Sequence, residues 1–256
     1  MEIIIQPTAE AVTALAARLL GKVICEKPAA VLGLATGGTM EPLYRELVAM
    51  KLDWNKLTTF NLDEYVGISP LHPQSYHSYM WDKLFQHVNI SIKSVHIPDG
   101  LAKDVRSACE HYEQKINAAG GIDLQLLGIG TSGHIGFNEP TSSLASRTRL
   151  KTLTPQTRRD NARFFETEAS VPFHVITMGI GTILESRHCV LVAFGEKKAR
   201  AIAEAVEGPI TAMNPASALQ WHPKVTVLLD EPAASELKMK EYYHWVYDHK
   251  PDWQKI

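Results

Sequence analysis

The stretch GIGTSGHIGFNEP, residues 128–140, decides the fold class of this chain and carries its most informative side chains. An apolar run from Leu124 to Ile129 predicts a buried strand that ends in this glycine-rich turn. Glycines allow a sharp turn and a close approach of the backbone to a ligand. The turn presents His134 and Glu139, and an imidazole beside a carboxylate can move protons near neutral pH. We therefore expect an active-site loop here; the alternative is a strand-to-helix turn with a capping histidine.

The same alternation of buried strands and helices extends along the whole chain of 256 residues. Strands are predicted at Ala30–Ala35, Leu57–Leu62, Leu124–Ile129, Val175–Met178, Cys189–Phe194 and Val225–Leu229, and helices at Val12–Val23, Leu43–Met50, Val105–Ala119 and Lys197–Val206. This order predicts an α/β fold with a mostly parallel sheet and helices on both faces. The length fits one large domain or two small ones. Because no repeat or Pro/Gly/Ser linker interrupts the pattern, we expect a single α/β domain over residues 1–256.

Composition excludes several classes of protein. A net charge of -2, with 26 basic and 28 acidic residues, gives no sign of a nucleic-acid surface. No apolar run is long enough to span a membrane, and the N-terminus lacks the features of a signal peptide. Cys25, Cys109 and Cys189 are odd in number and widely spaced. This spacing favours reduced thiols and a cytoplasmic location.

Ligands of open parallel sheets bind at the carboxyl ends of the strands. The turn after the predicted strand at Ala30–Ala35 contains Thr36, Gly37, Gly38 and Thr39. Its backbone N–H groups and hydroxyls can bind a phosphate, although a plain turn explains two glycines equally well. The lysine of a Walker loop and a GxGxxG motif are both missing, so nucleotide binding is poorly supported.

The next turn, NLDEY at residues 61–65, places Asp63 and Glu64 at the end of another strand. Strand side chains alternate, so one carboxylate is expected to point into the cleft and the other away. A carboxylate at this position can abstract a proton from carbon next to a carbonyl. Helix capping by Asp63 is the alternative.

Other catalytic groups have weaker support. The 11 histidines show no HxH, HExxH or Cys/His cluster, so no metal site is expected. There is no GxSxG elbow, and Ser132 lies too close in sequence to His134 for a usual triad. Cations for a phosphate are available in two basic segments: Arg147, Arg149, Lys151, Arg158, Arg159 and Arg163, and then Lys197, Lys198 and Arg200. Most such residues are solvated surface charges.

Seven motifs in order resemble the glucosamine-6-phosphate deaminase family over nearly the whole chain. They are LGLATGGT (32–39), FNLDEYVG (60–67), GHIGFNEP (133–140), SSLASRTRLKTLT (142–154), ARFF (162–165), MGIGT (178–182) and LDEP (229–232). The resemblance implies a modified open Rossmann-like sheet and an enzyme of amino-sugar catabolism. Its reaction converts glucosamine 6-phosphate and water into fructose 6-phosphate and ammonia without an organic cofactor.

The resemblance also assigns roles to individual residues. It makes Asp63 the base that removes the C2 proton, and His134, held by Glu139, the group that opens the sugar ring. The family's phosphate ligands match the residues Thr36, Gly37, Gly38, Thr39, Arg163 and Lys198. Ser132 is a departure, because other members carry Asp or Asn there in the ring-opening group. Since serine cannot be an anionic partner, we expect a changed rate and pH profile rather than a changed reaction.

Regulation is implied as well, because some members are hexamers activated by N-acetylglucosamine 6-phosphate. The positions that match the activator site are Ser142, Arg149, Lys151 and Thr152. His244 stands where those members have a tyrosine, with Tyr243 beside it. An activated hexamer is therefore expected, and an ordinary basic loop is the alternative.

Three other functions stay open from the sequence. A 6-phosphogluconolactonase resembles the family in fold and phosphate binding but needs no C2 base. A galactosamine-6-phosphate deaminase differs only at C4 of the sugar. A sugar-phosphate sensor domain would carry a DNA-binding helix-turn-helix. With the first strand expected near residue 30, after one helix, we expect no room for that element.

Overall fold

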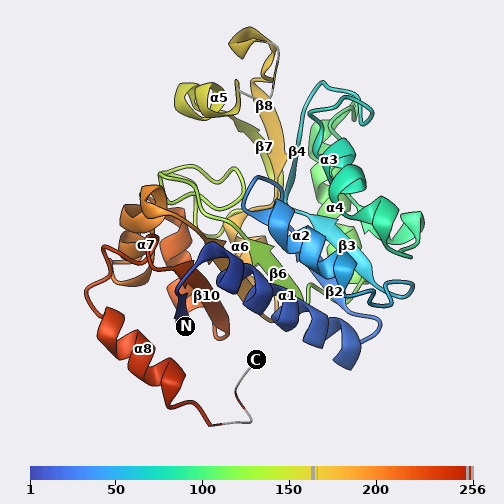
Figure 1. The fold of residues 1–256 in the computed structure, drawn as a ribbon. Helices are drawn as coiled ribbons and strands as arrows, with labels where there is room; N and C mark the ends of the chain where they lie inside the picture. The colour runs from blue at the N-terminus through green and yellow to red at the C-terminus, as the bar shows by residue number, and fades with distance from the viewer. Residues whose placement is uncertain (163–164, 166, 252–253, 255–256) are drawn as a thin grey trace.

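A parallel sheet forms the centre of the protein (Figure 1). The computed structural model describes residues 1–162, 165, 167–251 and 254. Within them the sheet has 7 strands in the order β1-β10-β9-β6-β2-β3-β5, and all neighbours are parallel. The strands are β1 (Glu2–Gln6), β2 (Val31–Leu34), β3 (Thr58–Asn61), β5 (Val95–His96), β6 (Leu124–Leu127), β9 (Cys189–Ala193) and β10 (Val225–Asp230). The predicted α/β class with a mostly parallel sheet is confirmed.

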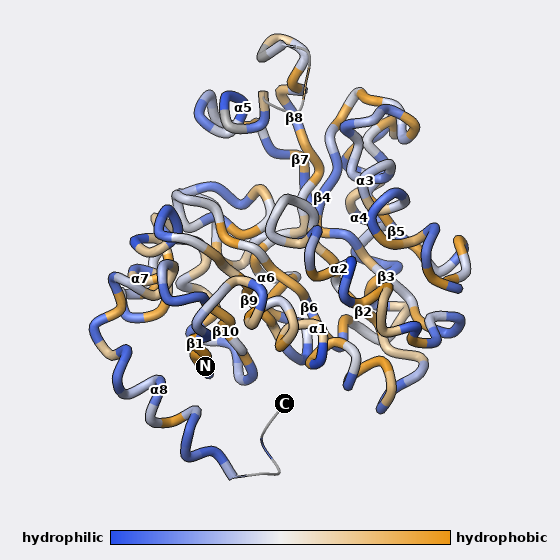
Figure 2. The backbone as a smooth tube through the Cα atoms, viewed as in Figure 1, coloured by the Kyte–Doolittle hydropathy of each residue, from blue (hydrophilic) through white to orange (hydrophobic). Residues whose placement is uncertain are grey.

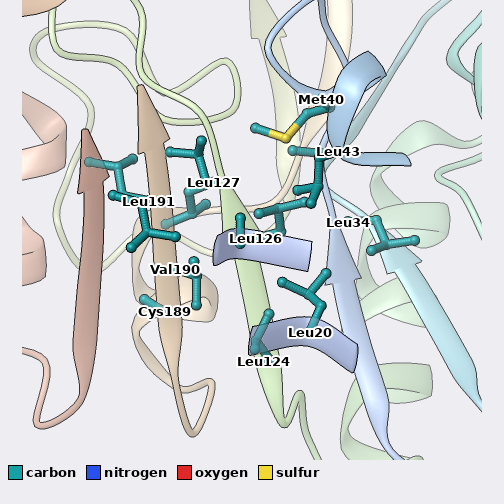
Figure 3. Packing of buried hydrophobic residues seen from close by; sticks show 14 of the residues in the cluster. Leu20, Leu34, Met40, Leu43, Leu124, Leu126, Leu127, Cys189, Val190 and Leu191 are labelled. Carbon is teal, nitrogen blue, oxygen red and sulfur yellow. The ribbon is translucent and has the colours of Figure 1, made fainter. Parts of the chain in front are cut away.

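Helices cover both faces of this sheet. The described helices are α1 (Ala9–Glu26), α2 (Met40–Ala49), α3 (Tyr76–Lys83), α4 (Val105–Ala118), α5 (Pro155–Ala162), α6 (Ile180–Leu184), α7 (Ala199–Val206) and α8 (Lys240–Asp248), of which α5 lies apart from this sheet (Figure 1). Gly33 is paired with Phe60 and Leu34 with Asn61, so Leu34 and Phe60 point to opposite faces. Phe60 meets Tyr112 of α4 edge-on at 5.6 Å between ring centroids. Leu34 lies on the face covered by α1 and α2 (Figure 3).

The core is built from continuous apolar runs in the central strands. Every residue of β2 and of β6 is buried, as expected for strands covered on both faces. Leu20 of α1, Leu43 of α2 and Leu126 of β6 belong to one buried apolar cluster (Figure 3). Figure 2 shows apolar residues concentrated in these strands and polar residues along α8. The hydrophobic effect therefore fixes the sheet, and with it the positions of the strand ends.

A second, smaller sheet lies beyond the carboxyl end of β3 (Figure 1). Its strands β4 (Asp63–Tyr65), β8 (His174–Thr177) and β7 (Arg149–Thr152) are antiparallel. Only Leu62 separates β4 from β3, so β4 continues out of the main sheet. Tyr65 and Phe137 belong to a separate apolar cluster beneath this sheet, with Leu153, Val171 and Val175.

Two sequence-based expectations about the strands were wrong. The first strand is β1 and not the one near residue 30; it lies at the sheet edge, paired only with β10 among the described strands. The strand predicted at Val175–Met178 forms as β8, but it pairs with β4 in the second sheet and not with the parallel one. The helix predicted from Lys197 begins at Ala199, after a 3-10 turn over Glu196–Lys198.

The three cysteines are free thiols in the structure. Cys25 is exposed, whereas Cys109 and Cys189 are buried. Among the described residues, none of the helices has both the length and the apolar character needed to cross a membrane.

Replacing Leu126 by alanine tests the central core. Leu126 is fully buried in the middle strand, so Leu126→Ala should lower the free energy of unfolding by about 2–5 kcal/mol. Leu71, which is 85% exposed, provides the control, and Leu71→Ala should change the stability by less than about 0.5 kcal/mol. Urea unfolding followed by circular dichroism measures both, and equal losses would contradict the assigned core.

Candidate active site

Four neighbouring strands of the main sheet, β9, β6, β2 and β3, end at one edge. The loops after them carry the predicted functional groups. Thr36–Thr39 follows β2, Asp63 follows β3, the loop from Gly128 to Pro140 follows β6, and Lys198 follows β9. Because parallel strands all point the same way, their loops gather at this edge. The structure thus brings together the groups that the sequence places about 160 residues apart.

His134, Ser132 and Glu139 form one hydrogen-bonded group in the loop after β6. The Ser132 hydroxyl lies 2.8 Å from His134 Nδ1 and donates to Glu139 Oε2 at 3.1 Å. Glu139 Oε2 is itself 3.2 Å from His134 Nδ1. The imidazole remains 23% exposed, whereas the carboxylate is nearly buried. The predicted His–Glu pair is thus present, and Ser132 bridges it.

The environment keeps Glu139 ionised. Burial raises its pKa, but hydrogen bonds and the charge of His134, with hydrogen bonds from Thr157 and Ser132, outweigh burial and lower the pKa to about 2. An ionised carboxylate only accepts hydrogen bonds, so the proton of the neutral imidazole is on Nδ1. The Nε2 atom then carries the free lone pair and can act as a base.

Two glycines make this loop possible. A Cβ atom at Gly130 would lie only 2.0 Å from His134 Cε1, so the ring lies directly over the backbone. Gly136 has φ +55, and a Cβ there would lie 3.3 Å from Asp63 Oδ2 and 3.0 Å from Thr177 Oγ1. The histidine loop therefore packs directly beside the Asp63 carboxylate.

Asp63 is a buried carboxylate at the first position of β4 and is only 5% exposed. No described residue donates a hydrogen bond to its side chain. Burial, and secondly the charge of Glu64, raise its pKa from 3.8 to about 8. Perturbed carboxylates of this kind mark functional sites.

Glu64 has a structural role on the other side of the strand. Its oxygens accept hydrogen bonds from the backbone N–H groups of Tyr65, Tyr76 and His77 at 2.8, 3.0 and 2.9 Å. The last two N–H groups open helix α3, where a carboxylate is favoured by the helix dipole. The expected division is therefore found: Glu64 caps a helix, and the alternative that Asp63 is the cap is wrong.

The predicted phosphate loop is open and polar. Gly37 and Gly38 are exposed, and in the described part of the chain no atom outside the neighbouring residues lies within 4 Å of a Cβ at either position. Thr39 is the N-cap residue of helix α2, and its side chain makes no capping hydrogen bond with a described residue, so N–H groups of the first turn can serve a ligand. Lys198 is half-buried at the start of α7. Arg163 lies outside the described residues.

The predicted activator residues are divided by the structure. Arg149 and Lys151 are half-buried and lie on one face of β7, because side chains alternate along a strand. The exposed Thr152 projects from the other face of the strand. Arg149 donates to Asn138 Oδ1 at 2.9 Å, beside the active-site loop. Ser142 is 3% exposed, and its hydroxyl has no hydrogen-bond partner among the residues that the structure describes. His244 pairs with Glu231 at 3.1 Å.

Among the described residues, no group of three or more His, Cys, Asp or Glu side chains is placed to hold a metal ion.

Residues 6–228 match the family model described as glucosamine-6-phosphate isomerases/6-phosphogluconolactonase. A glucosamine-6-phosphate deaminase from Arthrobacter sp. is 54% identical over 260 residues, with 100% of both chains covered. One from Streptomyces coelicolor is 53% identical over 261 residues, again with 100% of both covered.

Solved structures agree with these relatives. A monomeric glucosamine-6-phosphate deaminase aligns with a TM-score of 0.90 at 48% identity, covering 92% of this chain and 100% of that one. The 6-phosphogluconolactonase of Trypanosoma brucei aligns at 0.77 with 18% identity, covering 92% and 98%, and shows a shared fold. Fold and site together define an α/β enzyme of the open parallel-sheet class. The chain belongs to the family of glucosamine-6-phosphate isomerases and 6-phosphogluconolactonases, so the resemblance read from the motifs is confirmed.

Sequence reasoning missed Thr157. This buried residue on α5 donates a hydrogen bond to Glu139 Oε1, opposite the oxygen that faces His134. The available signal was the pair Thr154-x-x-Thr157 after a strand, which is typical of a helix start. Nothing in the sequence connected it to a glutamate 18 residues earlier.

Asp63→Asn should stabilise the protein increasingly as pH rises. The pKa of Asp63 is about 8 in the folded state and near 3.8 when exposed, so between these values the folded state binds the extra proton. Wild-type stability contributed by this group therefore falls as pH rises through that window. Asn removes this loss. Thermal unfolding at about pH 5 and about pH 8.5 should show a larger gain for the variant at the higher pH. The exposed Asp248→Asn variant is the control, and a gain that does not depend on pH would contradict the burial argument.

Proposed function

We propose that this chain is a cytoplasmic glucosamine-6-phosphate deaminase, which forms fructose 6-phosphate and ammonia from glucosamine 6-phosphate and water. The observation that carries the proposal is the buried Asp63 carboxylate beside the His134–Glu139 loop. Relatives named for this activity are 54% and 53% identical over the whole chain. Asp63 supplies a base that can remove a proton from carbon, and His134 supplies a base that can remove a proton from a hydroxyl oxygen.

Ring opening is the first step, and His134 is its base. Nδ1 is held by Ser132 and Glu139, so Nε2 can take the proton of the C1 hydroxyl and then pass it to the ring oxygen as the bond between C1 and that oxygen breaks. The imidazolium formed in this step is stabilised by the ionised Glu139. Ser132 supports the pair by a neutral hydrogen bond, where other members of the family have an acidic or amide side chain.

Isomerisation follows, and Asp63 is its base. Its raised pKa of about 8 favours the protonated form in the empty site. The C2 substituent of the substrate is an ammonium group, and a cation beside the carboxylate favours the ionised form. Asp63 then takes the C2 proton while the C1 carbonyl oxygen gains a proton, which gives an enol. The proton on Asp63 is returned at C1, and the ammonium group loses one proton, which balances the proton gained by the C1 oxygen. The product is a C2 imine, which water hydrolyses to the ketone with release of ammonia.

The phosphate of the substrate is held away from the reacting carbons. The residues proposed to bind it are Thr36, Gly37, Gly38, Thr39, Lys198 and Arg163. N–H groups at the start of α2 and a lysine at the start of α7 suit a dianion. Binding energy at this remote group orients C1 and C2 at the two bases.

Ammonia release from glucosamine 6-phosphate tests the function, beside galactosamine 6-phosphate and 6-phosphogluconolactone. We expect the first substrate to be preferred and activity to persist in EDTA. Asp63→Asn should lower turnover by at least about a hundredfold, because a positioned general base is lost. Exchange of the C2 proton with solvent, followed by NMR, should stop in the same variant.

Binding should survive this change, since the phosphate contacts are separate. The exposed Asp248→Asn variant should keep wild-type turnover and exchange. Continued C2-proton exchange in Asp63→Asn would show that another group is the base. Hydrolysis of the lactone without ammonia release from either amino sugar would replace the deaminase by a lactonase.

Regulation and assembly stay part of the proposal. The expected activator residues are Ser142, Arg149, Lys151 and Thr152. Arg149 and Lys151 lie on one face of β7 and suit a phosphate, whereas Thr152 faces away and a structural relative is described as monomeric. The prediction is a hexamer with N-acetylglucosamine 6-phosphate as its activator. For the activator to have an effect, it must bind one quaternary state of the hexamer better than another.

Light-scattering mass and substrate titrations with and without N-acetylglucosamine 6-phosphate test this prediction. A hexamer is expected, with a substrate curve that the activator shifts to lower concentrations. Arg149→Ala should remove the shift and keep turnover at saturating substrate. A monomer with a hyperbolic curve that the activator does not change would show that these residues have no regulatory function here.

A further inference from the structure

The two oxygens of the Glu139 carboxylate have different partners. Oε2 faces the imidazole, with His134 Nδ1 at 3.2 Å and the Ser132 hydroxyl at 3.1 Å. Oε1 accepts a hydrogen bond from the Thr157 hydroxyl. Glu139 is 6% exposed and Thr157 is 7% exposed, so water has little access to replace this donor. A buried carboxylate oxygen without a partner costs free energy.

Thr157 is itself held in place by the start of helix α5. Its backbone N–H donates to the Thr154 hydroxyl at 3.1 Å, and the two hydroxyl oxygens lie 2.9 Å apart. The hydroxyl of Thr157 donates to Glu139, so the Thr154 hydroxyl is the donor between the two threonines. The hydrogen bonds therefore run in one direction, from Thr154 through Thr157 to Glu139.

We propose that Thr157 is a positioning residue for the ring-opening pair, which it serves by fixing the Glu139 carboxylate from the side opposite His134. With contacts on both oxygens the carboxylate cannot rotate, and Oε2 stays directed at Nδ1. Without Thr157 the group is free to turn, and the imidazole loses its fixed orientation. This inference rests on the proposed ring opening by His134 and adds a residue from α5 to it.

The test compares Thr157→Val, which keeps the shape and removes the hydroxyl, with Thr157→Ser, which keeps the hydroxyl. Thr167→Val is the matched control: its hydroxyl lies 2.8 Å from that of Ser170, within the same segment. Ammonia release gives kcat and KM, and competitive inhibition by glucitol 6-phosphate reports phosphate binding in a molecule that has no ring to open. Thermal unfolding confirms that each variant is folded.

Thr157→Val should lower kcat by about tenfold or more, as expected for loss of a hydrogen bond to a charged group. Its inhibition constant for glucitol 6-phosphate should stay within about twofold of the wild-type value, because ring opening is not involved. Thr157→Ser should restore most of kcat, and Thr167→Val should match the wild type. If Thr157→Val does not fold, Thr157→Ala is measured against Thr157→Ser in the same way.

Three results would overturn the positioning role. The first is an unchanged kcat in Thr157→Val, and the second is a loss of kcat in Thr157→Ser equal to that in Thr157→Val. The third is a larger inhibition constant for glucitol 6-phosphate in Thr157→Val without a loss of kcat. The last would mean that Thr157 holds α5 for phosphate binding and does not act through Glu139. Absence of ammonia release by the wild-type protein is a different result. It would refute the proposed deaminase function, and it would not bear on the hydrogen bond from Thr157 to Glu139.

Discussion

The candidate site depends on the hydrogen bonds that stabilise the buried negative charge of Glu139. A carboxylate removed from water has to be paired or hydrogen-bonded, and this one receives donors from its own loop and from α5. Those donors lower its pKa to about 2. The permanent charge fixes the proton of His134 on Nδ1 and leaves Nε2 free. Loop, imidazole tautomer and helix α5 are thus set by the need to satisfy one buried group.

Asp63 lies in the opposite kind of environment, only a loop away. It is equally buried, yet no described residue donates a hydrogen bond to it, and its pKa rises to about 8. Two carboxylates whose surroundings move their pKa values apart are suited to different tasks in one reaction. Glu139 serves as a fixed charge, whereas Asp63 is poised to gain and lose a proton. Glu64, next to Asp63, takes neither role because its carboxylate accepts hydrogen bonds from three backbone N–H groups.

The architecture brings these groups together in two stages. The parallel sheet gathers the ends of β9, β6, β2 and β3 at one edge. The small antiparallel sheet then extends β3 through β4 and places α5 over the loop after β6 (Figure 1). The first stage follows from apolar strands that need cover on both faces. The second depends on the aromatic cluster around Tyr65 and Phe137, which supports strand β4 and the histidine loop together.

The sequence by itself determined four of the helices (α1, α2, α4 and α7), most strands of the main sheet and the chemical groups. Apolar runs and helical periodicity place the strands of the main sheet, apart from β1, whose short run Ile3–Ile5 passed unrecognised at the N-terminus, and the two-residue strand β5, which was not predicted. Ordered motifs indicate the family and most of the site residues. Only the tertiary structure decided that β8 joins the second sheet, that Glu64 caps α3, and that Thr157 reaches Glu139. Periodicity records what a segment buries, whereas strand pairing and side-chain hydrogen bonds between distant segments depend on how the packed elements meet in space.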